Sequence, residues 1–318
     1  MIKKILIPAI SLVLLLALGL GIFFGIRWYE DSKIKFEIND TLPDGGGKKA
    51  TVILLGGQSN ASGCSRDDYL KMTSTPEKYA EYEAGYDNVY INYYVSDNNE
   101  SKGFVKCKNR QGEADFYSDG SGGHFGPELG MAEKLHRERP DELFFIIKCA
   151  WGGTDLFEQW LSPSGGKAGK LYKKFVKFVK TSINYLESKN YDVEIEGMCW
   201  MQGESDSFST DHAIGYEQNL TAFIKDIRKE FKRYAAEDGI AFVDAYIANN
   251  PVFWVYCDLV NESKRKVADA SPMNVIVDTS SLVTTEEPQP TPDVPHYDSQ
   301  SELKLGYLFI EALTPFLK

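Results

Sequence analysis

Short apolar runs alternate with amphipathic stretches along most of the chain. The apolar runs have the length of buried strands and lie at residues 51–55, 143–149, 195–201, 240–243 and 274–277, with a more polar edge-strand candidate at 88–95. The amphipathic stretches repeat apolar residues at helical spacing and lie at 126–137, 171–188, 213–234 and 301–317. Strands that alternate with helices indicate βαβ units. The predicted fold class is therefore α/β, with a mainly parallel sheet covered by helices on both faces.

The N-terminal segment has the pattern of a membrane-spanning helix. An uncharged apolar run covers residues 5–26, between Lys3-Lys4 and Arg27-Trp28-Tyr29. A spanning helix needs about 20 apolar residues, whereas a cleaved signal peptide has an apolar region of about 7–15 residues. The lysines place the N-terminus on the cytoplasmic side. We expect a signal anchor at 1–29 and the rest of the chain on the extracytoplasmic face. Secretion after cleavage near residues 17–19 is the alternative.

A polar segment separates this anchor from the first strand. It covers residues 30–49 and contains three consecutive glycines at 45–47. This composition suits a flexible linker. We expect residues 50–318 to form a single α/β domain, although the length alone also permits two.

The composition narrows the possible partners. The chain has 318 residues, 43% of them hydrophobic, and a net charge of -11. Such an acidic chain argues against nucleic acid, which needs clustered positive charge, and against a surface that binds anionic lipid. The five cysteines are widely spaced and form no CxxC pair, so they give no sign of a zinc or redox motif. Cys149 and Cys199 end apolar runs and are expected to be buried thiols, although one disulfide remains possible.

Glycine stands beside polar residues directly after three of the predicted strands. Ligands of open α/β sheets bind at the carboxyl ends of the strands. Three successive strand ends of this kind therefore indicate a functional site at that edge of the sheet. The three loops are Gly56-Gly57-Gln58-Ser59-Asn60, Trp151-Gly152-Gly153-Thr154 and Gln202-Gly203-Glu204-Ser205-Asp206.

Ser59 is the candidate nucleophile, because a serine in such a loop can be activated by a base. Of the four histidines, His296 is the best candidate for that base. It lies just before the last predicted helix, three residues after Asp293. A carboxylate at this spacing can accept a hydrogen bond from the ring and fix its tautomer. The alternatives are a turn serine at 59 and a surface acid at 293.

An acyl-transfer site also needs donors for an oxyanion. The backbone N–H groups of Ser59 and Gly153 are candidates, because glycine allows a close approach. The side-chain amide of Gln202 is a further candidate, with Asn60 as a second choice. A purely structural role for Gln202 is the alternative.

Together these motifs resemble the sialate O-acetylesterase-like branch of the SGNH hydrolases, which contains carbohydrate acetylesterases such as acetylxylan and sialic acid esterases. The resemblance runs from about residue 51 to the C-terminus. It rests on Gly57-Gln58-Ser59-Asn60, Trp151-Gly152-Gly153-Thr154, the block from Trp200 to Asp206, and Asp293-x-x-His296. The segment Phe125-Gly126-Pro127-Glu128-Leu129 also resembles the usual helix opening of this branch.

The resemblance implies a three-layer α/β/α fold without a metal or another cofactor. It makes Ser59 the nucleophile, His296 the general base and Asp293 the residue that orients it. It makes Ser59, Gly153 and Gln202 the oxyanion donors, although the wider superfamily has asparagine in the third block. Residues expected to support this constellation are Gln58, Asn60, Glu204 and Asp206.

The expected reaction is removal of acetyl groups from a carbohydrate outside the cytoplasm, by a protein held in the membrane through its N-terminal helix. An esterase for another acyl group and a non-catalytic glycan-binding protein on the same fold remain as alternatives. Sugar specificity is expected in the predicted loops at 65–108, 162–170 and 245–261, whose sequences do not identify the sugar.

Overall fold

The computed structural model describes residues 34–114, 120, 122–284 and 294–318. Ile38–Lys318 form one unit by their internal contacts. The predicted signal anchor at 1–29 lies outside the described residues and stays a prediction. Among the residues that the structure describes, no helix is both long and apolar enough to cross a membrane.

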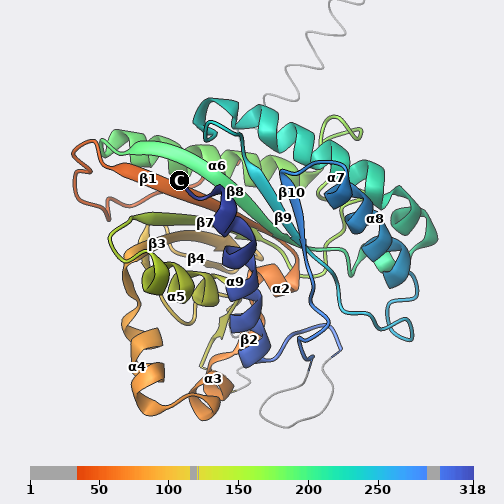
Figure 1. Ribbon diagram of the computed structural model, residues 1–318, viewed down its shortest axis with the longest axis horizontal. Helices are drawn as coiled ribbons and strands as arrows, with labels where there is room; N and C mark the ends of the chain where they lie inside the picture. Colours follow the sequence, from red (N-terminus) through yellow and green to blue (C-terminus); the bar gives the residue numbers. More distant parts are fainter. Residues whose placement is uncertain (1–33, 115–119, 121, 285–293) are drawn as a thin grey trace, which may run out of the picture. The chain divides into compact units, whose positions relative to one another are not determined.

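One sheet of eight strands runs through the described part of the chain (Figure 1). The strands at its centre are parallel, and their residues are almost entirely buried, as expected for a sheet covered on both faces. Two short strands, β4 (Asn99–Glu100) and β5 (Val105–Cys107), pair antiparallel with β3. The parallel strands are, in sheet order, β10 (Asn274–Val277), β9 (Ala241–Ala245), β8 (Asp192–Met201), β1 (Lys49–Gly57), β7 (Phe144–Ala150) and β3 (Tyr86–Val95). All six predicted strands are thus present.

Helices cover both faces of this sheet, as predicted (Figure 1). On one face lie α6 (Lys170–Ser188) and α7 (Thr210–Glu230), and α8 (Cys257–Asp269) packs beside α7. The other face carries α5 (Glu128–Glu138) and α9 (Ser299–Leu313). The predicted mixed α/β fold with a mainly parallel sheet is confirmed.

Three helices lie in stretches that the sequence pattern assigned to loops. They are α3 (Asp67–Thr73), α4 (Pro76–Ala84) and α8. The buried face of α8 includes Ser263 and Lys264 beside its apolar residues. Apolar residues are few in α8, so the segment is hard to distinguish from a polar loop by its pattern alone.

The end of the predicted linker is attached to the domain. The Asn39 N–H donates to the Lys102 carbonyl at 2.7 Å, and the Thr41 N–H donates to the Tyr185 hydroxyl at 2.8 Å. The Gly45 N–H donates to the Lys189 carbonyl at 2.6 Å. The part of residues 30–49 that follows Asn39 is therefore held by the domain and is not a free spacer.

All five cysteines lie in the described part of the chain and are free thiols. Cys149 in β7 and Cys199 in β8 are fully buried, on the two strands that flank β1, which agrees with the expectation from their apolar runs.

Candidate active site

Ser59 stands at the corner where β1 ends and the short helix α2 (Ser59–Ser62) begins. The turn depends on Gly57, whose φ is +139°, a value that side chains disfavour. A Cβ at this position would lie 1.9 Å from the carbonyl oxygen of Met201 in β8. The Gln58 N–H donates to that same carbonyl at 2.8 Å. The close approach of β1 and β8 thus fixes the position of Ser59, which is 7% exposed.

Asn60 holds the segment that carries His296 against this corner. Its Nδ2 donates to the carbonyl of Pro295 at 3.0 Å, and its Oδ1 accepts from the N–H of Tyr297 at 3.2 Å. Both chain neighbours of His296 are therefore bonded to the residue that follows Ser59. The structure brings the predicted nucleophile and base to the same place, although they are far apart in the sequence. The predicted partner Asp293 lies outside the described residues.

The second glycine loop faces the same corner. A Cβ on Gly152 would lie 3.7 Å from the Ser59 Cβ. Gly153 has a φ of +66°, and no described atom lies within 4 Å of the place where its Cβ would stand. Ser59 is the first residue of its helix, and the first N–H groups of a helix have no acceptor within it. The two N–H groups predicted as oxyanion donors, those of Ser59 and Gly153, are thus on adjoining loops.

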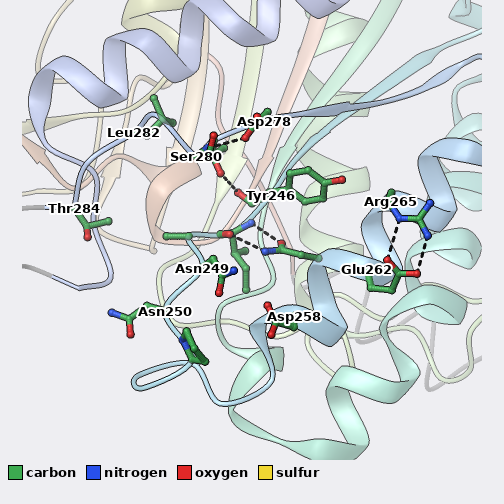
Figure 2. A pocket seen from close by; sticks show the side chains of 15 residues that line it. Tyr246, Asn249, Asn250, Asp258, Glu262, Arg265, Asp278, Ser280, Leu282 and Thr284 are labelled. Atoms are coloured by element: carbon green, nitrogen blue, oxygen red, sulfur yellow. Dashed lines mark hydrogen bonds and ion pairs between the residues drawn. The ribbon is translucent and has the colours of Figure 1, made fainter.

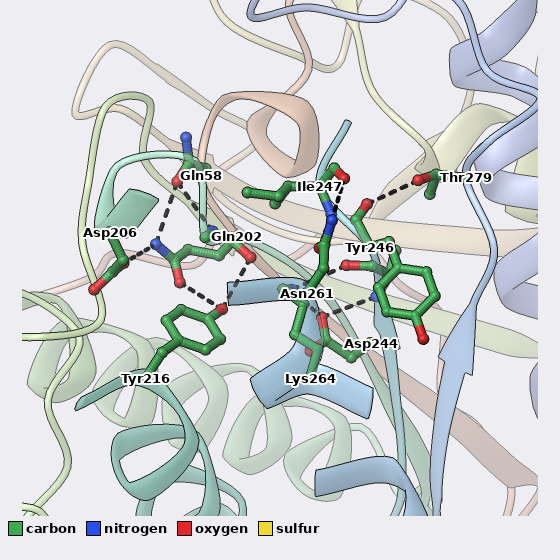
Figure 3. A network of polar contacts seen from close by, with 12 residues as sticks. Gln58, Gln202, Asp206, Tyr216, Asp244, Tyr246, Ile247, Asn261, Lys264 and Thr279 are labelled. Carbon is green, nitrogen blue, oxygen red and sulfur yellow. Dashed lines mark hydrogen bonds and ion pairs between the residues drawn. The ribbon is translucent and has the colours of Figure 1, made fainter. Parts of the chain in front are cut away.

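Gln202 is enclosed by protein groups (Figure 3). Its Nε2 lies 2.7 Å from the Asp206 carboxylate, 2.9 Å from the Thr154 carbonyl and 3.2 Å from the Gln58 Oε1. Its Oε1 accepts from the Tyr216 hydroxyl at 3.0 Å. An amide nitrogen has two hydrogens, and here three acceptors compete for them. In this arrangement Gln202 braces the loops and is not presented to a substrate, so its oxyanion role stays a prediction.

The other predicted supporting residues join the three loops to one another. The Gln58 Oε1 also accepts from the N–H groups of Gly203 and Ser205, at 3.3 and 3.2 Å. The Glu204 carboxylate accepts from Asn60 at 3.0 Å. Burial raises the pKa of Glu204, against the lowering effects of Asn60 and the nearby His296.

Asp206 connects the second loop to the third. Its carboxylate accepts from the N–H groups of Leu156 and Phe157, at 2.8 and 3.1 Å, as well as from Gln202. Burial raises the pKa of Asp206 to about 6, and the Leu156 N–H and the Gln202 amide act in the opposite direction. Asp206 therefore holds the second and third loops in position relative to each other.

Comparison with known families agrees with this geometry. The sequence model of the family described as "carbohydrate esterase, sialic acid-specific acetylesterase" matches residues 49–314. The chain belongs to this carbohydrate esterase family. The matched region includes every described residue of the site, and the resemblance drawn from the sequence motifs is confirmed.

Individual relatives of the chain are distant. A probable carbohydrate esterase of Arabidopsis thaliana is 29% identical over 107 residues, which are 33% of this chain and 36% of that protein. The solved structure of the same plant protein has a TM-score of 0.58 at 18% identity and covers 87% of this chain and 100% of its own.

Two further solved structures share the fold. NanS has a TM-score of 0.58 at 15% identity, with 87% of this chain and 98% of its own covered. A carbohydrate acetylesterase from Xanthomonas citri has a TM-score of 0.54 at 15% identity, with 84% of this chain and 56% of its own covered. At these identities the likeness shows the fold.

The candidate site also contains residues that the sequence did not single out. Glu113 lies beside the glycine loop, with its Oε1 2.9 Å from the place of a Cβ on Gly152. This oxygen accepts from the hydroxyls of Ser62 and Ser96, at 2.5 and 2.6 Å. Burial raises the pKa of the Cys64 thiol, and the adjacent His296 opposes this shift. Neither residue belongs to a recognisable motif, so only the fold reveals them.

A group of buried charged residues lies near Cys64. Lys148 and Glu128 form an ion pair at 2.7 Å, with both side chains fully buried. Glu302 is also fully buried, and neither of its carboxyl oxygens has a hydrogen-bond partner among the described residues. Burial, and after it the charge of Glu128, raise the pKa of Glu302 well above its usual value. Lys148 thus balances the charge of Glu128, whereas the raised pKa of Glu302 favours its neutral form.

One group of described residues has the composition of a metal site. Ligand atoms of Asp155, Asp206 and His212 lie within 4.8 Å of one another. The carboxylate of Asp155 accepts from the N–H of Glu158 at 2.6 Å, and Asp206 accepts from the backbone donors described above. The His212 ring stacks on Phe157, with the ring centroids 4.2 Å apart. These contacts explain the cluster as loop bracing, and we assign no metal to it.

Proposed function

We propose that this protein is a carbohydrate O-acetylesterase that uses Ser59 as nucleophile and His296 as general base. One observation carries the proposal: Asn60, the neighbour of Ser59, is hydrogen-bonded to both chain neighbours of His296. A turn serine would have no need of a histidine brought to it from the other end of the domain. Membership of a carbohydrate esterase family supports the same reaction class.

The proposed reaction begins when the Ser59 Oγ attacks the carbonyl carbon of a sugar acetate and His296 accepts its proton. The carbonyl oxygen becomes an oxyanion, which the N–H groups of Ser59 and Gly153 stabilise. The sugar oxygen leaves with the proton from His296. Water then attacks the acetyl group on Ser59 with His296 again as base, and acetate is released. Asp293 is the proposed partner that orients His296.

We propose a bracing role for Gln202 in this mechanism. Its amide can donate to an oxyanion only if it leaves the Thr154 carbonyl or the Asp206 carboxylate, to which it is bonded at 2.9 and 2.7 Å. The two backbone N–H groups need no such rearrangement.

The test of this proposal compares Ser59→Ala with wild type in hydrolysis of 4-nitrophenyl acetate and of acetylated xylan. Loss of the nucleophile should lower kcat by several orders of magnitude on both substrates. Ser62→Ala is the matched control, because it removes a buried hydroxyl from the same short helix; we expect it to keep most of the activity. Equal rates in Ser59→Ala and wild type would reject the proposal.

We also propose that the enzyme works on the extracytoplasmic face, anchored by residues 1–29. The length of the apolar run and the flanking lysines support this location. Fractionation of expressing cells tests it. The full-length protein should stay with alkali-washed membranes and be digested by protease added to cells whose outer layers have been opened. Recovery of a shortened protein in the medium would instead indicate cleavage and secretion.

A further inference from the structure

A pocket of about 670 Å³ lies at the carboxyl ends of β9 and β10, the end of the sheet where Ser59 stands (Figure 2). Its walls come from three stretches: the residues after β9, the first turns of α8, and the residues after β10. Ligand pockets of proteins have volumes of about 300–1,000 Å³. The pocket is thus large enough for a small molecule or for part of a bound polymer.

The walls of this pocket are fixed by hydrogen bonds. The amide of Asn261 bonds both backbone groups of Ile247: its Oδ1 accepts from the N–H at 3.0 Å and its Nδ2 donates to the carbonyl at 2.9 Å. The Thr279 hydroxyl donates to the Tyr246 carbonyl at 3.0 Å (Figure 3). The backbone after β9 is therefore held open by side chains of α8 and of the segment after β10.

The pocket adjoins the candidate active site on one wall. Thr284, which lines it, forms a β-bridge with Tyr297, the residue after His296. The Asp298 N–H also donates to the Val283 carbonyl at 2.9 Å. The third glycine loop also contacts this pocket, because a Cβ on Gly203 would lie 3.2 Å from the side chain of the lining residue Ile247. The pocket thus shares walls with the segment that carries His296 and with the third glycine loop of the candidate active site.

The polar lining of this pocket favours a ligand with hydroxyl groups over an anion. Tyr246 offers a partly exposed ring and hydroxyl, and Asn249, Asn250 and Asp258 add polar side chains to the lining (Figure 2). Amides and carboxylates accept hydrogen bonds from hydroxyls, and amides also donate them.

The charges of the lining residues disfavour the binding of an acidic ligand. Of the described lining residues, Asp258, Glu262 and Asp278 are acids, and Arg265 alone is a base. The Arg265 guanidinium is already paired with Glu262 at 2.7 Å and with Asp269 at 2.6 Å. No cation of the lining is left to receive a carboxylate.

We infer that this pocket is a subsite for a neutral glycan, holding a sugar ring next to the one whose acetyl group lies at Ser59. The inference rests on the proposed function and narrows its substrate. The preferred substrate is an acetylated, uncharged oligosaccharide or polysaccharide, and free O-acetylated sialic acid, which carries a carboxylate, is a poor one.

The test compares the full chain in detergent with Tyr246→Ala, using an acetylated xylo-oligosaccharide and 4-nitrophenyl acetate. The measured quantity is the ratio of kcat/KM for the oligosaccharide to kcat/KM for the small ester. Loss of the ring should lower this ratio by about tenfold, as an aromatic contact of about 1.4 kcal/mol predicts. Tyr234→Ala is the matched control, because this partly exposed tyrosine lies in the turn before β9, at the opposite end of that strand. Its ratio should stay at the wild-type value.

A charge variant tests the preference for neutral sugars. Wild type should hydrolyse the xylo-oligosaccharide better than O-acetylated N-acetylneuraminic acid, and Asp258→Lys should shift this preference toward the anionic sugar. An unchanged oligosaccharide ratio in Tyr246→Ala, or a wild type that prefers the anionic sugar, overturns the inference.

A binding measurement separates the two proposals. Titration calorimetry with a deacetylated xylo-oligosaccharide reports the subsite without hydrolysis. Binding that Tyr246→Ala weakens supports the subsite even if no ester is cleaved, in which case the proposed enzymatic function fails. Cleavage of 4-nitrophenyl acetate without any such binding keeps the esterase and refutes the subsite.

Discussion

Asn60→Ala is the variant that tests how the site is assembled. The substitution removes three hydrogen bonds, to the Glu204 carboxylate, the Pro295 carbonyl and the Tyr297 N–H. A hydrogen bond contributes about 1 kcal/mol to stability on average. The free energy of unfolding should therefore fall by up to about 3 kcal/mol. The loop that carries His296 should also lose its fixed position beside Ser59.

The substitution should also lower the activity of molecules that remain folded. A misplacement of about 1 Å in a catalytic group can lower the rate about 100-fold. We expect a fall of that order in kcat/KM for 4-nitrophenyl acetate, measured at a temperature where the variant is fully folded. Thermal unfolding followed by circular dichroism gives the stability in parallel.

Asn88→Ala is the matched control. Asn88 is also a buried asparagine with three hydrogen bonds, donating to the carbonyls of Arg139 and Glu142, at 3.1 and 2.9 Å, and contacting the His136 ring at 2.7 Å. It lies near the amino end of β3, away from the site. It should destabilise the protein about as much as Asn60→Ala and leave kcat/KM near the wild-type value. Equal activities in the two folded variants would refute the role given to Asn60.

Three further variants test the buried groups. Glu302→Gln should reduce the pH dependence of stability, because a raised folded-state pKa makes wild type lose stability as pH rises above the unfolded value near 4.3. Urea unfolding at acid and alkaline pH should show the full slope in wild type and in the exposed control Glu311→Gln. The slope should be smaller in Glu302→Gln, and the part that remains is due to other buried acids such as Glu204 and Asp206. Lys148→Met leaves the buried Glu128 unpaired and should cost about 3–5 kcal/mol of unfolding free energy; a loss below about 1 kcal/mol would contradict the buried ion pair. Gly57→Ala should prevent soluble expression of active enzyme, because its methyl group meets a backbone carbonyl of β8 at 1.9 Å, and normal yield and activity would contradict the tight turn.

The sequence predicts the frame of this site because local patterns encode it. Apolar runs followed by glycine mark the ends of β1, β7 and β8, and adjacent parallel strands bring those ends together. The predicted loops at Ser59, Gly153 and Gln202 therefore meet in the structure. The enclosed state of Gln202 was not predictable, since it depends on partners such as Thr154 and Tyr216 that come from other elements.

The remaining features depend on contacts between distant residues. The bond from Asn60 to the segment around His296 joins opposite ends of the domain, and no spacing in the sequence signals it. Helix α8 escaped prediction because it has few apolar residues, and part of its buried face is polar: Lys264 pairs there with Asp244 at 2.7 Å. The pocket beside this helix was hidden because its walls come from three segments, after β9, in α8 and after β10, and no pattern in the sequence indicates that they meet.

Covalent labelling of Ser59 tests the central claim most directly. The full chain in detergent is treated with a fluorophosphonate, which reacts with serines that a neighbouring base activates, and the modified peptide is identified by mass spectrometry. The account predicts one adduct, on Ser59, and its formation should be slowed by orders of magnitude in His296→Ala. An unlabelled Ser59, labelling of another serine, or equally fast labelling without His296 would contradict it.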